Sequence, residues 1–390
     1  MKSNTIRLSL GAALAGILSL SPLANADVYT LSNSAEGNEV LAFDLDDKSG
    51  AITALGSFST GGTGSGAPLG NQSALVTDAS DRWLFATNAG DGSLTSFRLQ
   101  SDGLQFVNNI ASGGSSAISV TVYGTLVYVL NEGTGNANDA PEDRYDNISG
   151  FRFTGGGVLQ PIPGSTRILD DTRLTAPAQI GFNKSGTVLL VTEKVTNMLT
   201  TYVMGDDDRP AQAPIKRPSA VPTPFGFAFG DRDYVFITEA NGGSQGVTAS
   251  YRIDRVTGTV SSLVDLIDQG DAACWTVLTN DEKIGYSVNT GSGSISPYRV
   301  NFNGTIEPFF DANPSFQFPT GTSPRDAVLT QDGRFILTLN NGDGQLRVAR
   351  VGRDGTLSNA IGGTLGGRRG ASPASAGIDI PTSATGLMAR

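Results

Sequence analysis

A short pattern of residues recurs seven times along the chain, and it constrains the fold more than any other feature. Each copy is an apolar stretch that ends in Ser, Asn or Glu, as in LFATN and VFITE. The copies end at Ser32, Asn88, Asn131, Glu193, Glu239, Asn289 and Asn340, with intervals of 56, 43, 62, 46, 50 and 51 residues. A repeat of short strands at intervals of this length, present in seven copies, indicates a β-propeller with seven blades.

The segments around each copy supply three further strands. A polar turn such as NKSG or QDGR precedes most copies, and an apolar strand such as SALVT or QIGFN precedes the turn. A third strand such as SLTSFRL follows, and then a turn and a weaker fourth strand. Four antiparallel strands make one propeller blade. The longest interval contains a polar insertion from Glu132 to Asn147.

The two ends of the chain fit a closed ring. The first copy lacks the innermost strand, and PASAGIDI at Pro373–Ile380 matches the start of the fourth repeat, APAQIGFN, in its small and apolar residues. We therefore expect Pro373–Ile380 to complete the first blade and to pair its open edge. A two-sheet sandwich also has short strands, but the sevenfold period disfavours it. No long segment after the amino terminus has helical periodicity, which excludes all-helical and α/β folds.

The amino terminus predicts export. Lys2 and Arg7 precede an uncharged run from Leu8 to Leu20, and the pattern Ala24-Asn25-Ala26 follows. This pattern is typical of a secretory signal peptide of residues 1–26. We expect residues 27–390 to form one propeller domain, periplasmic or secreted, with no membrane span.

Composition excludes several classes of function. The formal net charge of −10 disfavours a nucleic-acid partner, because such proteins need basic patches to neutralise phosphates. Histidine is absent, which excludes mechanisms that depend on a histidine base or metal ligand. Cys274 is the single cysteine and cannot form an internal disulfide, and we expect it to be a small buried apolar residue. A closed ring leaves no free sheet edge, so we expect a monomer.

The repeat places a candidate site at the mouth of the central channel. The second strands all end on one face, so their last residues are expected to form a polar ring there. The innermost strands begin on the same face with Gln72, Gln179, Phe225, Cys274, Trp275, Arg325 and Asp326. Asn is also common at strand ends because its side chain satisfies loop backbone groups, so the Asn residues have a structural interpretation as well. Two glutamates near a channel mouth need partners or a function.

These segments resemble the seven-bladed lactonase propeller family, which includes phosphogluconolactonase and carboxymuconate lactonizing enzyme. The resemblance rests on QSALVTDASDRWLFATNAGDGSLTSFRL, APAQIGFNKSGTVLLVTEKVTN, PFGFAF, ACWTVLT and YSVNTGSGSIS. It implies the opening of a lactone, or its formation from an unsaturated acid. It also implies a cluster of Arg, Glu and His at the channel mouth, of which this chain lacks the histidine.

The resulting hypothesis assigns a role to each candidate residue. Glu193 or Glu239 would activate water, and Arg325 would stabilise the oxyanion. The remaining candidates would bind the lactone or organic acid: Asn88, Asn131, Gln179, Trp275, Asn289 and Asn340. Lys194 is expected to form a structural salt bridge with Glu193.

Two alternatives remain open at this stage. Two carboxylates with Asn carbonyl oxygens would also suit Ca²⁺ or Mg²⁺. A propeller that binds a ligand or a protein without catalysis is the alternative function, and the insertion with Asp143, Arg144 and Tyr145 would then form part of the contact.

Overall fold

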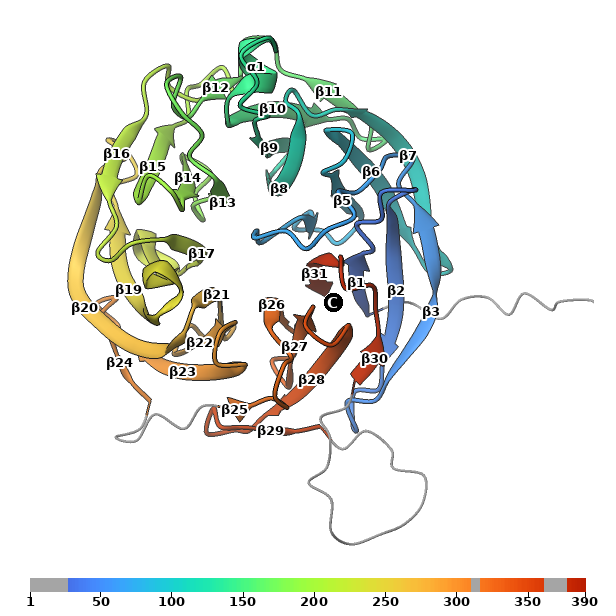
Figure 1. Cartoon of the computed structure of the whole chain (residues 1–390), viewed down its shortest axis with the longest axis vertical. Coiled ribbons are helices and arrows are strands. Elements are labelled where there is room, and N and C mark those ends of the chain that lie inside the picture. The colour runs from blue at the N-terminus through green and yellow to red at the C-terminus, as the bar shows by residue number, and fades with distance from the viewer. Residues whose placement is uncertain (1–26, 310–315, 361–376) are drawn as a thin grey trace, which may run out of the picture.

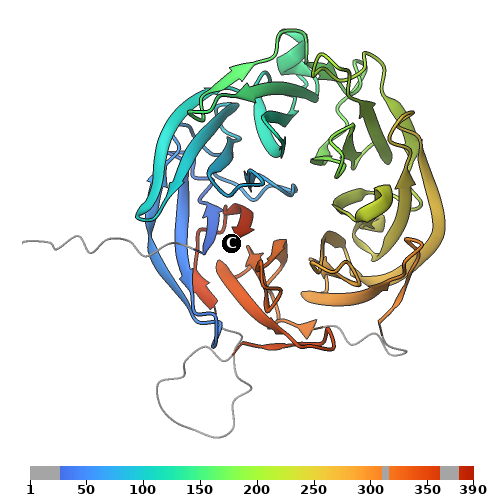
Figure 2. The ribbon, with the colours of Figure 1, turned by 180° about the vertical axis from the view of Figure 1, so that it is seen from behind.

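Seven antiparallel sheets are arranged in a ring around a central axis (Figures 1 and 2). The computed structural model describes residues 27–309, 316–360 and 377–390. The predicted signal peptide, residues 1–26, lies outside the described residues. Each sheet has four strands in order from the axis to the rim, and three sheets have a fifth short strand beside them, so the predicted seven-bladed propeller is confirmed.

The first four blades contain the strands listed here from the innermost outward. Blade 1 consists of β31 (Thr385–Ala389), β1 (Val28–Leu31), β2 (Glu39–Leu45) and β3 (Ile52–Ser59). Blade 2 consists of β4 (Leu75–Thr77), β5 (Trp83–Asn88), β6 (Ser93–Gln100) and β7 (Gly103–Ala111). Blade 3 consists of β8 (Ser116–Tyr123), β9 (Leu126–Glu132), β10 (Asn147–Phe153) and β11 (Leu159–Pro161), with β12 (Arg167–Ile168) also on β10. Blade 4 consists of β13 (Pro177–Phe182), β14 (Val188–Glu193), β15 (Met198–Val203) and β16 (Ile215–Pro218).

The other three blades follow the same order. Blade 5 consists of β17 (Pro224–Phe229), β18 (Tyr234–Glu239), β19 (Gln245–Ile253) and β20 (Val260–Asp271). Blade 6 consists of β21 (Ala273–Leu278), β22 (Ile284–Asn289), β23 (Ser294–Val300) and β24 (Ile306–Pro308), with β25 (Phe316–Gln317) also on β23. Blade 7 consists of β26 (Pro324–Leu329), β27 (Phe335–Asn340), β28 (Gln345–Val351) and β29 (Leu357–Asn359), with β30 (Gly377–Asp379) also on β28.

Helical structure is short in the described part of the chain. It consists of α1 (Pro141–Arg144) in the insertion between β9 and β10, and the 3₁₀ turns η1 (Asp231–Asp233) and η2 (Asn241–Gly243). No helix in the described ranges is long and apolar enough to cross a membrane.

The hydrophobic core lies between the blades. The second strands β5, β14 and β27 are buried at every position. Both faces of such a strand are covered by neighbouring sheets, which explains why these segments read as continuous apolar runs instead of alternating ones. Phe335 of blade 7, for example, packs in one cluster with Phe43 and Leu387 of blade 1.

The carboxyl-terminal strand closes the ring, as predicted, but a different segment performs this role. β31 pairs with β1 and becomes the innermost strand of blade 1, with Tyr29 opposite Met388. The expectation that Pro373–Ile380 is this strand is wrong: its described part contains β30, which pairs with β28 in blade 7. The small-residue pattern of PASAGIDI also suits an outer strand, and it could not distinguish the two positions.

The innermost strands share a backbone irregularity at the channel mouth. Five of them, β8, β13, β17, β21 and β26, shift register against the second strand within their first few residues. The residue just before four of these strands has a left-handed φ: Ala176, Thr223, Ala272 and Ser323. Bulges of this kind re-aim side chains, and they occur often next to functional sites.

One segment between blades 1 and 2 reaches the centre of the ring (Figure 1). We call Leu69–Ser73 the hub segment. Its Asn71 accepts hydrogen bonds from Thr385 in blade 1, at 2.9 Å, and from the Trp275 indole in blade 6, at 3.0 Å. The Asn71 amide also donates to the Ile118 carbonyl in blade 3.

The hub segment contacts the remaining blades as well. Gln72 N–H donates to Ala178 O in blade 4, at 3.1 Å, and its Oε1 lies against Gly226 in blade 5. Gly226 is required there, because an added Cβ would collide with Gln72 Oε1. Leu69 O accepts from Arg325 in blade 7, at 3.5 Å. A single short segment thus fastens the inner strands of the other six blades to one another.

A buried carboxyl group lies at the junction of blade 7 and the closing strand. Asp326 is 3% exposed, and its carboxylate accepts the backbone N–H of Ala327, at 2.8 Å, and of Leu387, at 3.0 Å. Burial raises the pKa of Asp326 from 3.8 to about 7. The folded protein therefore holds this proton at pH values at which the unfolded chain releases it.

We predict that Asp326→Asn removes a pH dependence of stability. Below pH 3.8 both states bind the proton; between 3.8 and about 7 the wild type loses stability as pH rises, and above 7 the loss levels off. The total loss is at most about 4 kcal/mol, from roughly 1.4 kcal/mol per pKa unit. Denaturant unfolding from pH 4 to 8 should show a steeper decline in the wild type than in Asp326→Asn. Asp332→Asn, in the following turn, should keep the wild-type slope, and equal slopes for all three proteins would contradict the prediction.

Candidate functional site at the channel mouth

The side chains predicted to ring the channel mouth lie inside the blades. Six of the seven are 0% exposed, namely Asn88, Asn131, Glu193, Glu239, Asn289 and Asn340, and Ser32 is 4% exposed. All seven lie within one residue of the end of a second strand, so they are on the same face of the ring, as the repeat predicted. Their side chains, however, make hydrogen bonds with their own blade or the one beside it.

The Asn side chains bond to strand residues, three of them to a residue of the next strand and Asn340 to its own. Asn88 Nδ2 donates to the hydroxyls of Ser93, at 3.0 Å, and Thr95, at 2.9 Å, both on the next strand. Asn289 makes the equivalent bonds to Ser294 and Ser296. Asn131 bonds to Asn147 of β10, and Asn340 to Thr338. The structural interpretation of Asn at strand ends therefore describes these contacts, and substrate binding by these four residues remains a prediction.

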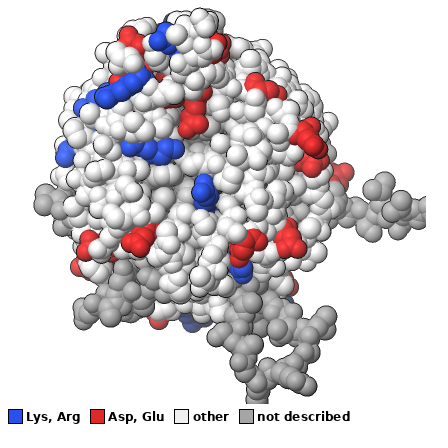
Figure 3. All heavy atoms as spheres, viewed as in Figure 1, with Lys and Arg blue, Asp and Glu red and all other residues white. Residues whose placement is uncertain are grey.

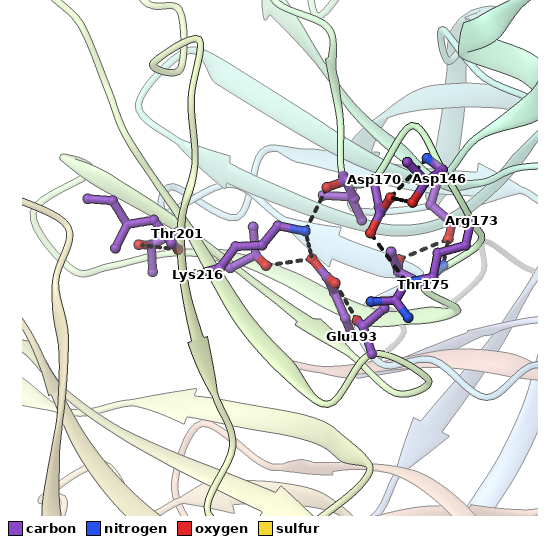
Figure 4. Close-up of polar contacts among 12 residues, drawn as sticks. Asp146, Asp170, Arg173, Thr175, Glu193, Thr201 and Lys216 are labelled. Atoms are coloured by element: carbon purple, nitrogen blue, oxygen red, sulfur yellow. Dashed lines mark hydrogen bonds and ion pairs between the residues drawn. The ribbon is translucent and has the colours of Figure 1, made fainter.

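Glu193 is enclosed by the outer strands of blade 4 (Figure 4). Its two carboxylate oxygens accept hydrogen bonds of 2.5 Å from the hydroxyls of Thr200 and Thr196. Lys216 Nζ lies 3.3 Å from Oε1. The expected salt bridge with Lys194 is therefore wrong: consecutive residues of a strand point to opposite sides, and Lys194 leaves β14 on the other side.

Glu239 is enclosed between blades 4 and 5. It accepts hydrogen bonds from Tyr251 Oη at 2.5 Å, Val221 N at 2.6 Å and Ala220 N at 3.3 Å. Burial raises the pKa of this carboxyl, although the three donors oppose that rise. Because Glu193 and Glu239 are engaged in separate blades, they do not form a joint set of oxygen ligands for Ca²⁺ or Mg²⁺. The described residues also contain no group of three or more Asp, Glu, Cys or His that could hold a metal ion.

We predict that Glu239→Gln costs stability and leaves the chemistry of the mouth intact. The amide would turn a donor toward Val221 N–H or Tyr251 Oη, and a buried donor without an acceptor costs roughly 1–3 kcal/mol. Urea unfolding should show this loss, while Glu36→Gln on an exposed turn should unfold like the wild type. A Glu239→Gln protein with wild-type stability and no activity would support the original catalytic role.

The residues that follow these seven are the next candidates for the lining of the mouth, because side chains alternate between the two sides of a strand. These are Asn33, Ala89, Glu132, Lys194, Ala240, Thr290 and Asn341, which we call the mouth ring. Thr290 Oγ1 donates to Pro324 O, at 2.9 Å, where the innermost strand of the next blade begins. Asn341 Nδ2 donates to Ala384 O just before β31, at 3.0 Å. Side chains alternate along a strand, so the residue after each repeat residue points to the opposite side of the strand from it.

Main-chain hydrogen bonds hold three residues of the mouth ring in place. Lys194 N–H donates to Ala176 O at 3.2 Å, Ala240 N–H to Thr223 O at 2.8 Å, and Thr290 N–H to Ala272 O at 3.0 Å. The acceptors are the residues with left-handed φ that precede the innermost strands. The signal in the sequence is a small residue before the strand start, followed by proline in Ala176-Pro177, Thr223-Pro224 and Ser323-Pro324.

Lys194 points from blade 4 toward the hub segment. Its Nζ donates to Gly70 O at 2.6 Å and lies 5.1 Å from the centre of the Phe225 ring. Burial lowers the pKa of Lys194, and Glu132, Cys274 and Asp146 partly offset this effect. Phe225 in turn packs edge-on against Trp275, with ring centres 5.3 Å apart.

Arg325 reaches the same place from blade 7. Its Nη1 lies 3.5 Å from Leu69 O, and its buried Nε has no hydrogen-bond partner among the described residues. Lys194 and Arg325 thus contact the carbonyl groups of two consecutive residues of the hub segment. Within the described ranges neither cation has a carboxylate as its direct partner.

Glu132 contributes the carboxyl group of this cluster. It ends β9 and is half-buried, and no hydrogen bond or ion pair engages its carboxylate among the described residues. Burial raises the pKa of Glu132, and the charge of Lys194 opposes that rise. Sequence reasoning missed Glu132 as a site residue because it treated Asn131 as the end of the strand pattern.

The last two candidates have structural contacts. Gln179 bridges blades 4 and 5: its Oε1 accepts from Phe227 N at 2.7 Å, and its Nε2 donates to Phe227 O at 3.2 Å. Cys274 is 6% exposed, as expected for a buried apolar residue, and burial raises its pKa to about 11. A thiol with that pKa is not ionised at neutral pH, so it is a poor nucleophile.

Charged groups are sparse on the face of the ring in Figure 3. A basic group lies near the centre, and acidic groups are scattered toward the periphery without forming a continuous patch. The cluster of Glu132, Lys194, Arg325, Phe225 and Trp275 is a candidate site because it joins acid, base and aromatic groups from five blades.

Comparisons with known proteins agree with this architecture. Residues 34–139 match the family described as "Lactonase, 7-bladed beta-propeller". No curated protein sequence matches the chain. A proposed 6-phosphogluconolactonase of Bacteroides fragilis superposes with a TM-score of 0.68 at 14% identity, covering 94% of this chain and 99% of that one. The periplasmic gluconolactonase of Pseudomonas aeruginosa gives 0.67 at 17% identity, with 93% and 98% covered.

The comparisons define the class of the protein more closely than its activity. A hypothetical selenium-binding protein of Sulfolobus tokodaii also superposes, with a TM-score of 0.65 at 10% identity and 95% and 94% of the chains covered. At these identities the superpositions show the fold, which different functions share. The chain is therefore a seven-bladed propeller. It is lactonase-like in the sequence of residues 34–139, which contain the hub segment and Glu132.

Proposed function

We propose that the protein is an exported lactonase-like propeller that hydrolyses a small-molecule lactone at the channel mouth. The observation that supports this is the meeting of Glu132, Lys194 and Arg325 around the hub segment. The proposal keeps Arg325 and Trp275 from the sequence hypothesis. It assigns the acid–base role to Glu132 because, unlike Glu193 and Glu239, its carboxylate is half-buried and without a direct partner among the described residues.

The proposed reaction needs water and no further reactant. Glu132 accepts a proton from water, and the resulting hydroxide attacks the carbonyl carbon of the lactone. Lys194 and Arg325 stabilise the oxyanion that forms. When the ring C–O bond breaks, the leaving alkoxide takes the proton back from Glu132, and the product is a hydroxy acid. Phe225 and Trp275 provide the apolar wall of the site.

We predict a bell-shaped dependence of lactone hydrolysis on pH. Glu132 acts as a base when ionised and its pKa is raised, so the acidic limb should lie above the usual range for glutamate. Lys194 acts when protonated and its pKa is lowered, so the alkaline limb should lie below the usual range for lysine. The measurement is kcat/KM for a panel of γ- and δ-lactones from pH 4 to 10.

Matched substitutions test the assignment. Glu132→Gln should lower kcat about 100-fold or more and remove the acidic limb, since a positioned base contributes roughly that much. Glu142→Gln, an exposed acid in the neighbouring insertion, is the control and should retain activity. Activity that survives in Glu132→Gln but is lost in a stably folded Glu193→Gln protein would favour the original hypothesis. Repeating the assay with EDTA, and then with added Ca²⁺ or Mg²⁺, tests the cation hypothesis.

Export and the alternative of binding alone have separate tests. Export is proposed on the pattern of residues 1–26, and mass spectrometry of the amino terminus should find Asp27 as the first residue of the mature protein. A monomer is expected in gel filtration. The absence of turnover over the whole lactone panel, with retained binding of organic acids, would favour the non-enzymatic propeller.

A further inference from the structure

Two cations at the channel mouth are bound to main-chain carbonyls instead of carboxylates. Lys194 Nζ contacts Gly70 O at 2.6 Å, and Arg325 Nη1 lies 3.5 Å from Leu69 O. The Arg325 contact is long, and Arg325 Nε is buried without a hydrogen-bond partner in the described ranges. Charge-assisted bonds to an oxyanion are stronger than bonds to a neutral carbonyl, so this arrangement leaves Arg325 incompletely satisfied.

The two carbonyls belong to consecutive residues, and the two cations lie near enough for the charge of Arg325 to lower the pKa of Lys194. They project from blades 4 and 7, on different sides of the hub segment. A planar carboxylate or a phosphate presents two or more oxygens, as the Leu69 and Gly70 carbonyls do together. Arg325 could bind such a group through both Nε and an Nη nitrogen.

We propose that Lys194 and Arg325 form a binding site for a small oxyanion, and that Leu69 and Gly70 of the hub segment occupy this site when no ligand is present. An oxyanion binds by displacing the two carbonyls. The hub segment is then an internal competitor, and the affinity for the ligand is set by the difference between the two sets of contacts. The inference rests on the proposed function in one respect: the ligand with the acidic group binds at the same channel mouth as the proposed lactone.

The position of Gly70 supports displacement at this point. A Cβ added there would lie 3.3 Å from both Lys194 Nζ and Phe225 Cζ. The backbone of Gly70 is not in the left-handed region, so an alanine is tolerated by its φ. Because Gly70 has no side chain, the hub segment can approach Lys194 closely. The methyl group of an alanine at this position would crowd that contact.

Trp275 gives a direct optical measurement of the displacement. Its indole donates to Asn71 O, the next residue of the hub segment, and it is 1% exposed. The other tryptophan, Trp83, begins β5 at the end away from Asn88 and would be replaced in a Trp83→Phe background. Titration with gluconate, as a carboxylate, and with inorganic phosphate should change the Trp275 emission in a saturable manner. Chloride at equal ionic strength should not change it.

Two variants with opposite expected effects test the inference. Lys194→Met keeps the apolar stem and removes the charge, and it should weaken binding of the effective anion roughly tenfold or more. Gly70→Ala weakens the internal competitor and should tighten binding several-fold, which no folding defect would produce. Lys184→Met, which removes an exposed lysine paired with Asp231, is the control and should titrate like the wild type.

The outcomes separate the carboxylate from the phosphate and the inference from the proposed function. Saturable binding of gluconate alone, or of phosphate alone, identifies the group that the site accepts, and the inference stands. No saturable change with either anion, or equal titrations of wild type and Lys194→Met, overturns it. Anion binding without turnover of any lactone overturns only the proposed hydrolysis, whereas turnover without anion binding overturns only the inference.

Discussion

The stability of every blade depends on contact with the two blades beside it, and the ring is therefore only as secure as its closure. The apolar side chains of the second strands pack against neighbouring sheets, as in the cluster that joins Phe335 to Phe43 and Leu387. Strand β31 completes this arrangement by pairing with β1 at the point where the two ends of the chain meet. The same junction holds Asp326, whose hydrogen bond to Leu387 N–H ties blade 7 to the closing strand.

The hub segment adds a second level of connection at the axis. Hydrogen bonds from Asn71 and Gln72 reach four blades, and Leu69 and Gly70 contact others through Arg325 and Phe225. The segment therefore has two consequences that cannot be separated. It links the inner strands, and it places polar main-chain groups against the cations that make the mouth chemically distinctive.

Much of the fold could be predicted from the sequence because each copy of the repeat corresponds to one blade. The seven second-strand ends, the antiparallel order and the closure by a carboxyl-terminal strand all follow from it. The closing segment itself was misassigned, since β30 and β31 are both short and contain small residues. Pairing between distant segments depends on packing at the ring junction, which PASAGIDI alone does not encode.

The candidate site was predictable in its location but not in its residues. The face and the channel mouth follow from topology, and Arg325 and Trp275 follow from the starts of innermost strands. Glu132 and Lys194 did not, because they directly follow Asn131 and Glu193, which the repeat marks, and side chains alternate between the two sides of a strand. The hub segment was also missed, since nothing in the residues of a glycine-rich connection shows that it passes through the centre of a ring.

The main-chain hydrogen bonds of the mouth ring have a consequence for how the ligand preference of such a protein can change in evolution. Lys194, Ala240 and Thr290 are held by main-chain bonds to Ala176, Thr223 and Ala272, so at these three positions the identity of the side chain contributes little to the local path of the chain. Exchanging one of these side chains alters the lining of the mouth at one place and leaves the scaffold unchanged. Three separately replaceable positions would let related proteins acquire new ligand preferences through few substitutions, without redesign of any blade.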